Sequence, residues 1–508
     1  MTTEQSNFVR LHNGDNVVVA TENLEPGMSV AGVVVGDQLP TGHKVSIVPI
    51  ASGEAVRKYD QIIGFASQDI QAGEHVHTHN CEYRADFERD TAPGVDATPT
   101  DFVPSAQRAT FEGFMRADGR VGTRNYIGIL ATVNCSATVA KMIAAHFTAE
   151  KLQAYPNIDG VVAFTHGTGC AMDLQSEGYA TLQRTFNGYA RHVNLGGILL
   201  VGLGCESAQV KDLMDRYEMK DGSAFQHLVI QDTGGTEKTV MAGIARVEEM
   251  LIHANQVTRQ TVSAEHLTLA LQCGGSDGYS GITANPALGA AADLLVRHGG
   301  TVILAETPEI YGAEHLLTRR SESREVAEKL MQRIEWWEDY TARNRGSMDN
   351  NPSPGNKAGG LTTILEKSLG AAAKGGTTNL VDVYQYAEAV TRKGFVFMDS
   401  PGYDPVSITG QVASGANIVT FTTGRGSVFG YKPAPSVKLA TNTAMYERMS
   451  GDMDVNCGAI LTESVSVEEM GQRIFDLLLE IASGKPSKSE ALGFGDNEFT
   501  PWLIGTVM

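Results

Sequence analysis

Four apolar runs between residues 126 and 232 limit the folds open to this chain more than any other feature. The runs are YIGILAT (126–132), GVVAFT (160–165), GGILLVG (196–202) and HLVIQD (227–232). Each run is short and continuously apolar, which is typical of parallel strands that are buried on both faces. Helical patterns lie between the runs. This alternation predicts a Rossmann-like α/β domain over residues 111–262.

A second series of apolar runs predicts another Rossmann-like parallel sheet, over residues 263–508. Its first run, LTLALQ (267–272), is followed at once by a thiol and by a loop of Gly, Ser and Asp residues. In open α/β sheets, ligands bind outside the carboxyl ends of the strands. The candidate site residues at or just after these strand ends are Cys273, Ser276, Asp277, Asn285, Glu306, Asp399, Thr423 and Arg425.

The first 90 residues show a different pattern. Val-rich runs such as 16–20 and 32–36 are separated by Gly, Pro, Asn and Asp residues, which predicts a small all-β domain. The polar stretch 91–110 contains three prolines and little periodicity, so we interpret it as a linker. A length of 508 residues agrees with two to four domains.

Three alternating histidines, His75, His77 and His79, close the all-β region. On a strand they would share one face, with neighbours about 6–7 Å apart. Imidazoles at that spacing can bind a metal or act as acid and base near neutral pH. The alternative interpretation is a solvated edge strand.

Two hypotheses account for cysteines at strand ends. In the first, a thiolate such as Cys170 is a nucleophile and His166 is its base. In the second, the strand-end thiols converge on iron between the two α/β domains, with carboxylates as further ligands. The predicted metal ligands are Cys135, Cys170, Cys205, Cys273, Glu306 and Asp399. Inert buried thiols and helix-capping carboxylates are the alternative, and we interpret Cys81 and Cys457 as structural.

Cationic residues are candidates for binding a carboxylate. Arg120 and Arg124 lie in a loop before the first α/β domain, where they could form a bidentate clamp. Arg425 stands between two glycines after a predicted strand, and Lys357 lies in the irregular stretch NPSPGNKAGG. The alternatives are a solvated turn for the two loop arginines and a surface lysine for Lys357.

Composition excludes several classes of partner. The chain has 40 Lys and Arg against 59 Asp and Glu, a net charge of −19. Nucleic acids and anionic membranes bind clustered cations, so neither is expected. We find no apolar run of about 18 residues, no leader pattern and no Walker loop. Six cysteines are too few for a disulfide scaffold, so we expect a cytoplasmic protein with reduced thiols.

Several long strings together resemble the altronate/galactarate dehydratase family of sugar-acid hydro-lyases. From residue 111 onward they are GFMRADGRVGTRN, LVGLGCE, QCGGSDGYSGITANP, NPSPGNKAGG, SLGAAAKGG and FTTGRGSVFG, in this order. The N-terminal region resembles the SAF (β-clip) domain that family members carry. The string GEHVHTHN (73–80) resembles the altronate branch, whereas YPNIDGVV (155–162) and residues 318–340 resemble the galactarate branch.

The resemblance implies loss of water from an aldonate or aldarate to give a 2-keto-3-deoxy acid. It also implies dependence on Fe²⁺ or another divalent metal such as Mn²⁺, and a homodimer, for which residues 111–262 are the candidate dimerisation domain. The iron could be a single ion or part of an iron–sulfur cluster, and the sequence leaves both alternatives open. Altronate is the main expected substrate. The alternatives are galactarate, a related elimination of sulfite from sulfolactate, and a sugar-acid-binding protein without catalysis.

The physical demands of dehydration assign trial roles to these residues. The proton next to a carboxylate is weakly acidic, so the developing enediolate needs a metal or a cationic clamp. A base must remove that proton and an acid must assist the leaving hydroxide. We expect the histidines to be the acid and base, the strand-end groups to hold the metal, and Arg425 or Lys357 to bind the carboxylate.

Overall fold

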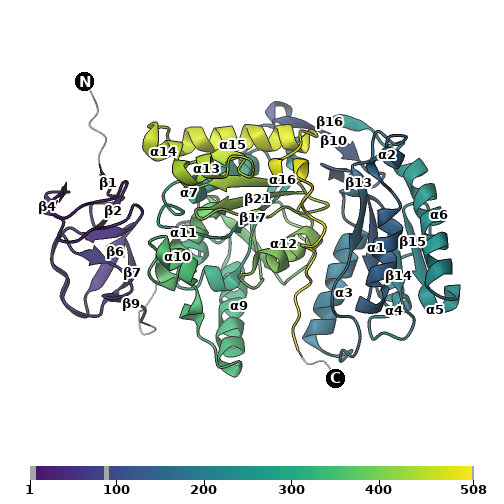
Figure 1. Ribbon diagram of the computed structural model, residues 1–508, viewed down its shortest axis with the longest axis horizontal. Coiled ribbons are helices and arrows are strands. Elements are labelled where there is room, and N and C mark those ends of the chain that lie inside the picture. Colours follow the sequence, from purple (N-terminus) through teal and green to yellow (C-terminus); the bar gives the residue numbers. More distant parts are fainter. Residues whose placement is uncertain (1–6, 85–90, 506–508) are drawn as a thin grey trace.

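The computed structural model describes residues 7–84 and 91–505, in three parts that lie in a row (Figure 1). A small all-β module (purple) lies at one end, the C-terminal α/β domain (green to yellow) in the middle, and the second domain (blue to teal) at the other end. The predicted fold class is confirmed, because two parallel sheets with helices follow a small all-β region.

The N-terminal module is built from short antiparallel strands. Two sheets, β1-β2-β5-β8 and β6-β7-β9, and the hairpin β3-β4 enclose Val and Ile side chains. The strands are β1 (Phe8–Val9), β2 (Val17–Ala20), β3 (Ser29–Val30), β4 (Val33–Val34), β5 (Lys44–Ser46), β6 (Ala55–Lys58), β7 (Gln61–Ala66), β8 (His75–Val76) and β9 (Cys81–Glu82).

The predicted histidine strand is much shorter in the structure. β8 ends at Val76, because the side chain of Asn80 closes a turn there. Its amide donates to the carbonyl of His75 at 2.9 Å, and its oxygen accepts from the backbone N–H of His77 at 2.9 Å. The three histidines therefore do not lie on one regular strand.

The second domain has a four-stranded parallel sheet in the order β13-β12-β14-β15. Its strands are β12 (Tyr126–Ala131), β13 (Gly160–Phe164), β14 (Leu195–Gly202) and β15 (Phe225–Val229). Its helices are α1 (Ala137–Ala145), α2 (Ala149–Leu152), α3 (Glu177–Ala190), α4 (Val210–Arg216), α5 (Ile230–Thr233) and α6 (Thr236–Ala254). The first three apolar runs of the sequence coincide with strands, whereas the fourth, 227–232, begins in β15 and ends in α5.

The C-terminal domain has a seven-stranded parallel sheet in the order β19-β20-β18-β17-β21-β22-β23. Its strands are β17 (Thr268–Cys273), β18 (Thr301–Leu304), β19 (Leu380–Tyr384), β20 (Gly394–Met398), β21 (Ile418–Thr423), β22 (Ser436–Ala440) and β23 (Val455–Asn456). The chain runs outward from β17 on one side, through β18, and later on the other side, through β21. The carboxyl ends of β17 and β21 thus form the switch point at which such sheets bind ligands.

Helices cover both faces of this sheet. They are α7 (Ala284–Arg297), α8 (His315–Thr318), α9 (Arg324–Arg343), α10 (Pro354–Ala358), α11 (Ile364–Ala372), α12 (Asp404–Ala413), α13 (Thr443–Arg448), α14 (Ala459–Thr462), α15 (Val467–Ala482) and α16 (Lys488–Ala491). In the described part of the chain, no helix combines the length and the apolar character needed to cross a membrane.

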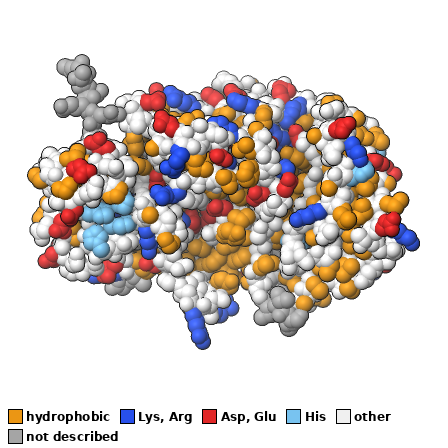
Figure 2. All heavy atoms as spheres, in the orientation of Figure 1, with side chains coloured by type: hydrophobic (Ala, Val, Ile, Leu, Met, Phe, Trp, Pro, Cys, Tyr) orange, Lys and Arg blue, Asp and Glu red, His pale blue; other side chains and the backbone are white. Residues whose placement is uncertain are grey.

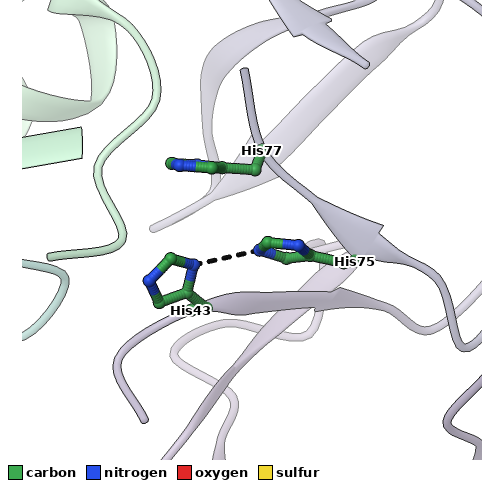
Figure 3. A group of neighbouring side chains, drawn as sticks. All are labelled: His43, His75 and His77. Carbon is green, nitrogen blue, oxygen red and sulfur yellow. Dashed lines mark hydrogen bonds between the residues drawn. The ribbon is translucent and has the colours of Figure 1, made fainter. Parts of the chain in front are cut away.

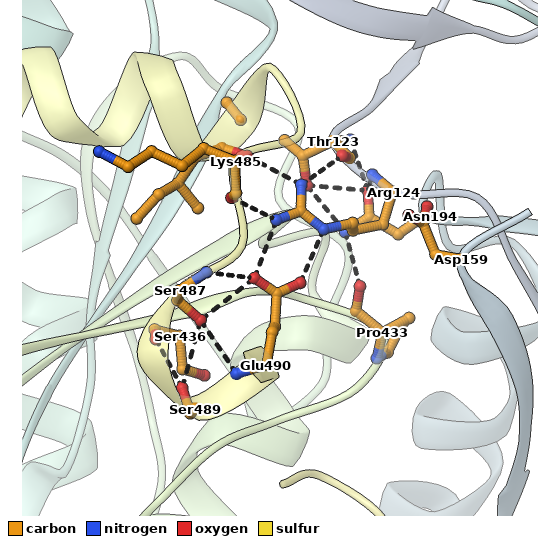
Figure 4. A network of polar contacts seen from close by, with 12 residues as sticks. Thr123, Arg124, Asp159, Asn194, Pro433, Ser436, Lys485, Ser487, Ser489 and Glu490 are labelled. Atoms are coloured by element: carbon orange, nitrogen blue, oxygen red, sulfur yellow. Dashed lines mark hydrogen bonds and ion pairs between the residues drawn. The ribbon is translucent and has the colours of Figure 1, made fainter. Parts of the chain in front are cut away.

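A small antiparallel sheet and one buried arginine join the two α/β domains. The sheet contains β10 (Thr110–Met115), β11 (Val121–Gly122) and β16 (Arg259–Ser263). Beside it, the guanidinium of Arg124 donates to both carboxylate oxygens of Glu490, at 2.7 and 2.9 Å (Figure 4). It also donates to the carbonyls of Thr123, Ile481 and Lys485. All five donors of this guanidinium are therefore used, and none remains for a substrate carboxylate.

We predict that Arg124→Met destabilises the fold. The side chain of Arg124 is only 3% exposed, and its loss leaves the carboxylate of Glu490, which is 14% exposed, without its ionic partner. Breaking such a pair costs about 3–5 kcal/mol, which urea unfolding would measure. Arg120→Met is the matched control, because the side chain of Arg120 is 53% exposed and pairs with Asp118 at the surface. Equal midpoints for the two variants would contradict this role.

Candidate active site

A buried cluster of charged groups lies at the carboxyl ends of β17 and β18. Cys273 is the last residue of β17, and its thiol lies 2.8 Å from the Nζ of Lys374. Glu306 follows β18, and its Oε2 lies 3.8 Å from the same Nζ. We call this set the strand-end cluster: the buried residues Cys273, Glu306, Glu309, Lys367 and Lys374, together with the half-buried Asp404.

Local backbone geometry places the glutamates of the strand-end cluster. Glu306 has a φ of +73°, in the left-handed region that non-glycine residues seldom adopt. This conformation turns the chain sharply after β18, and the backbone N–H of Glu306 donates to Ser400 Oγ at 3.0 Å. Glu309 then lies one short turn further on, with its Oε1 2.7 Å from the Nζ of Lys367. Strained residues of this kind concentrate at functional sites.

Burial separates the protonation states of the two glutamates. Desolvation and the neighbouring charge of Glu309 raise the pKa of Glu306 well above its ordinary value. Burial alone would also raise the pKa of Glu309, but Lys367 and Lys374 lower it. One carboxyl thus keeps its proton while its neighbour is charged, which is the arrangement of an acid and base pair. Oε2 of Glu306 is buried and makes no hydrogen bond.

The remaining groups of the strand-end cluster respond to the same burial. Burial raises the pKa of the Cys273 thiol to about 12, so the sulfur is protonated at neutral pH. Burial and the charge of Glu309 raise the pKa of Asp404 to about 6. Both Asp404 and Glu306 accept hydrogen bonds from the side-chain amide of Gln272, at 3.0 and 2.7 Å.

A second cluster, of histidines, lies in the N-terminal module. His43, His75 and His77 turn their rings toward one another (Figure 3), and Nδ1 of His43 lies 3.0 Å from Nε2 of His75. One ring nitrogen from each of the three lies within 4.8 Å of the others. The ring of His79 lies 5.5 Å from that of His75 but is outside this group. We call His43, His75 and His77 the histidine cluster.

The three imidazoles of the histidine cluster are neutral near pH 7. Burial, together with repulsion by other histidines and by Lys44, lowers the pKa of His75 to about 3 and that of His77 to about 4. Burial and Lys44 also lower the pKa of His43. Neutral imidazole is the form that binds metals. Nδ1 of His77 is buried without a hydrogen-bond partner. A buried nitrogen of this kind is expected where a ligand binds it.

The loop 348–361 connects the two clusters. At one end, Asn351 donates to Glu309 at 3.0 Å and accepts from Lys367 at 2.8 Å. At the other end, Nε2 of His43 lies 3.4 Å from the carbonyl oxygen of Ala358. Lys357 is half-buried in α10, next to Ala358. In Figure 2 the histidines form a pale blue patch on the module, beside the C-terminal domain.

A cavity of about 390 Å³ opens where the module, the loop and the switch point meet. Its cationic side chains are those of Arg425 and Arg448. Its other residues include Thr41 and Tyr279, whose hydroxyls are hydrogen-bonded to each other, and Asp277 and Asn442. A pocket of a few hundred Å³ with a few convergent polar groups suits a small polar ligand.

Several predicted site residues are engaged in structural hydrogen bonds. Asp277 accepts from Ser280, Thr441 and Asn442, and Asn285 bridges the carbonyl of Gly370 and the hydroxyl of Thr422. Thr423 accepts from the N–H of Gly426, Ser276 accepts at its carbonyl from Asn356, and Asp399 accepts from Thr307 and Trp337. Arg120 is bound to Asp118 and to the carbonyl of Arg191.

The structure does not bring all the predicted metal ligands together. Cys273 and Glu306 meet, and Glu309 joins them within 4.8 Å. Asp399 is not part of this group, and Cys135, Cys170 and Cys205 are exposed on the second domain. His166 is no base for Cys170, because its ring nitrogens contact the carbonyl of Ala131 and the N–H of Thr168. Burial also lowers the pKa of His166 to about 4.

Sequence reasoning missed five residues that the structure adds to the two clusters. His43 lies 32 positions before His75, too far for any local spacing to connect them. Glu309, Lys367, Lys374 and Asp404 lie between predicted strands rather than at their ends. Two strings that carry the resemblance were the one available signal for the lysines: Lys374 lies within SLGAAAKGG, and Lys367 lies between that string and NPSPGNKAGG.

Family models match all three parts of the chain. Residues 6–84 match the altronate/galactarate dehydratase SAF domain, residues 113–255 match the second domain of D-galactarate dehydratase/altronate hydrolase, and residues 264–507 match the D-galactarate/altronate dehydratase C-terminal domain. The chain belongs to the altronate/galactarate dehydratase family. This confirms the resemblance found in the sequence.

Relatives within and near the altronate/galactarate dehydratase family align over most of the chain. An altronate dehydratase of Bacillus subtilis is 35% identical over 94% of this chain and 95% of its own length. A galactarate dehydratase (L-threo-forming) of Escherichia coli is 36% identical over 94% of this chain and 93% of its own length. The β subunit of a (2R)-sulfolactate sulfo-lyase of Chromohalobacter salexigens is 31% identical over 76% of this chain and 95% of its own length.

A buried ion triad fixes the N-terminal module to the C-terminal domain. Lys44 and Lys58 of the module donate to opposite oxygens of Glu366, at 2.9 and 3.0 Å, and all three side chains are at most 1% exposed. Burial alone would raise the pKa of Glu366, but Lys44 and Lys58 hold it well below its ordinary value. The triad thus stabilises the docked module wherever Glu366 is ionised.

We predict that Glu366→Gln loosens the docked module at neutral pH. The change leaves two buried ammonium groups unpaired, at a cost of about 3–5 kcal/mol. Because the folded pKa of Glu366 lies below its unfolded value of about 4.3, the stabilisation is fully present above that pH and is lost as pH falls through the folded pKa. Urea unfolding and limited proteolysis at pH 7 would measure the loss.

The matched control is Glu82→Gln, since the side chain of Glu82 is 47% exposed and pairs with Arg84 at the surface. The stability difference between Glu366→Gln and the parent protein should shrink as the pH falls below about 4. A difference that is absent at pH 7, or that grows toward acid pH, would contradict the role of the triad.

Proposed function

We propose that this chain is a sugar-acid dehydratase that removes water from altronate to give a 2-keto-3-deoxy acid. The observation that carries the proposal is alignment along 94% of the chain with an altronate dehydratase, at 35% identity. The histidine string that predicted the altronate branch supplies two members of the histidine cluster. Galactarate is the second candidate substrate, because a galactarate dehydratase is 36% identical over a similar length.

The strand-end cluster and the histidine cluster are not equally suited to bind a metal ion. In the strand-end cluster, two lysine ammonium groups already lie within 2.7–2.8 Å of ligand atoms, so a divalent cation there would be repelled. The histidine cluster has three neutral imidazoles and one unpartnered buried nitrogen. We therefore assign the metal to His43, His75 and His77. Imidazole ligands suit Fe²⁺ and, less strongly, Mn²⁺, and such an ion supplies Lewis acidity for enediolate formation.

The strand-end cluster has the protonation pattern that elimination requires. Glu306 is a protonated carboxyl with a free oxygen, so it can donate a proton to a departing hydroxide. Glu309 is charged and can accept a proton, and Lys374 and Lys367 stabilise negative charge beside them. These roles reverse the expectation from sequence, in which the histidines were the acid and base.

Substrate binding is assigned to the cavity at the switch point. Arg425 and Arg448 supply two cations for a carboxylate in a chain whose net charge is −19. Lys357 remains a candidate for the same role, because it is adjacent to the carbonyl that faces His43. We also propose a homodimer in the cytoplasm. All six cysteines are free in the structure, as a reducing compartment requires.

A substrate screen tests the activity directly. We expect turnover of altronate, measured as formation of the 2-keto acid, to exceed that of galactarate by at least about tenfold in kcat/KM, a difference of about 1.4 kcal/mol. Sulfolactate, assayed by sulfite release, is the third substrate. Preference for galactarate would move the chain to the other branch of the family. Tight binding of altronate without turnover of any substrate would refute catalysis.

Metal removal and His77→Ala test the assignment of the metal. Chelation should abolish activity, and Fe²⁺ under reducing conditions should restore it in the parent protein. In His77→Ala we expect a loss of about 100-fold or more in kcat, together with weaker Fe²⁺ binding by calorimetry. His12→Ala is the control, because His12 lies in the same module but is more than half exposed. Full activity of thoroughly demetallated protein would rule out the metal.

A further inference from the structure

Three of the six cysteines are unexplained by the proposed function. Cys135, Cys170 and Cys205 are exposed, whereas Cys81, Cys273 and Cys457 are buried. Cysteine is among the most buried residue types, and exposed thiols are prone to oxidation. Three exposed thiols in one domain therefore need a physical reason.

The fold brings these three cysteines to one edge of the second domain. Cys135 follows β12, Cys170 follows β13 and Cys205 follows β14, and these three strands are neighbours in the order β13-β12-β14. All three strands run parallel. Their carboxyl ends, and the loops that carry the cysteines, thus lie side by side.

Hydrogen bonds tie the three loops together next to each cysteine. The N–H of Asn134, beside Cys135, donates to the carbonyl of Thr168 at 3.0 Å. The carbonyl of Gly169, beside Cys170, accepts from the N–H of Ala208 at 3.0 Å. Thr132 donates to the carboxylate of Glu206, beside Cys205, at 2.9 Å. Each loop is held by another, so the cysteines are held in place before any ligand arrives.

The backbone around the thiols adopts the left-handed conformations found in anion- and cluster-binding loops. Gly169 and Ala171, on either side of Cys170, have φ of +98° and +52°, and Gly204, before Cys205, has +126°. A Cβ on Gly169 would lie 2.2 Å from the carbonyl oxygen of Thr132. Backbone concavities with such residues bind phosphates and iron–sulfur groups. One sulfur, that of Cys205, already accepts a hydrogen bond from Gln231.

The spacing of the thiols argues against a single metal ion. In a tetrahedral site with metal–sulfur bonds of about 2.3 Å, the sulfurs lie about 3.8 Å apart. Among the described residues, the groups whose ligand atoms lie within 4.8 Å of one another are the histidine cluster and Cys273 with Glu306 and Glu309. The three exposed cysteines form a wider set. In an iron–sulfur cluster, each thiolate can bind a different iron, so wider spacing is required.

We propose that Cys135, Cys170 and Cys205 bind an iron–sulfur cluster at the carboxyl edge of the second domain's sheet. Binding replaces each S–H bond by a sulfur–iron bond and releases three protons to solvent. In a four-iron cluster, three thiolates leave one iron without a cysteine, open to an oxygen ligand. This site is separate from the histidine cluster, and it does not rest on the proposed function.

Reconstitution of the full chain with Fe³⁺, sulfide and a thiol reductant under anaerobic conditions tests this site, because the thiol reduces half of the ferric iron to give the mixed-valence core. We expect about four acid-labile sulfides per chain and about four irons in addition to the one assigned to the histidine cluster, with charge-transfer absorption and an electron paramagnetic resonance signal after reduction. The variant with Cys135→Ser, Cys170→Ser and Cys205→Ser should lose the sulfide and both signals. If circular dichroism shows that the triple variant does not fold, the three single variants replace it in the same measurements.

Two controls separate this site from the rest of the protein. Cys457→Ala removes a buried thiol of the C-terminal domain and should keep the full cluster signal. His77→Ala should also keep it, even though its dehydratase activity is lost. The proposal would be overturned if the parent protein incorporated no sulfide, if it bound only zinc at these thiols, or if the triple variant gave the same signals as the parent protein.

Discussion

The buried carboxylate of Glu366, held between Lys44 and Lys58, determines the relation between the N-terminal module and the rest of the protein. The two lysines come from β5 and β6 of the module, and Glu366 comes from α11 of the C-terminal domain. Ionic groups this deeply buried are stable only when they are paired with good geometry. The triad therefore admits one docked position of the module and disfavours others.

The docked position of the module determines which of its side chains lie close to the C-terminal domain. Lys44 directly follows His43, so the contact that buries Lys44 also brings His43 to the carbonyl of Ala358. The same loop reaches the strand-end cluster through Asn351. The proximity of Lys44 also helps to keep the imidazoles neutral. One buried ion triad thus affects geometry and protonation together.

The polar strand ends of the two α/β domains differ in burial. In the C-terminal domain, the carboxyl edge is closed over by helices and loops, so its thiol is protonated and its glutamates have different protonation states. In the second domain, the corresponding edge is open, and its three thiols reach solvent. Although both edges follow from the same strand-and-loop pattern, burial gives them different chemistry.

Local patterns determined much of this protein from sequence alone. Both parallel sheets, the small all-β region and the polar residues at strand ends follow from short runs of neighbouring residues, because hydrophobic periodicity is a local property. Sequence could not link His43 to His75, or Lys374 to Cys273, since those contacts join segments that are distant along the chain. Nor could it show that Glu490 and three backbone carbonyls together occupy all the donors of Arg124. Tertiary structure alone decided which polar groups meet and which carry charge, because both depend on how separate segments pack and exclude water.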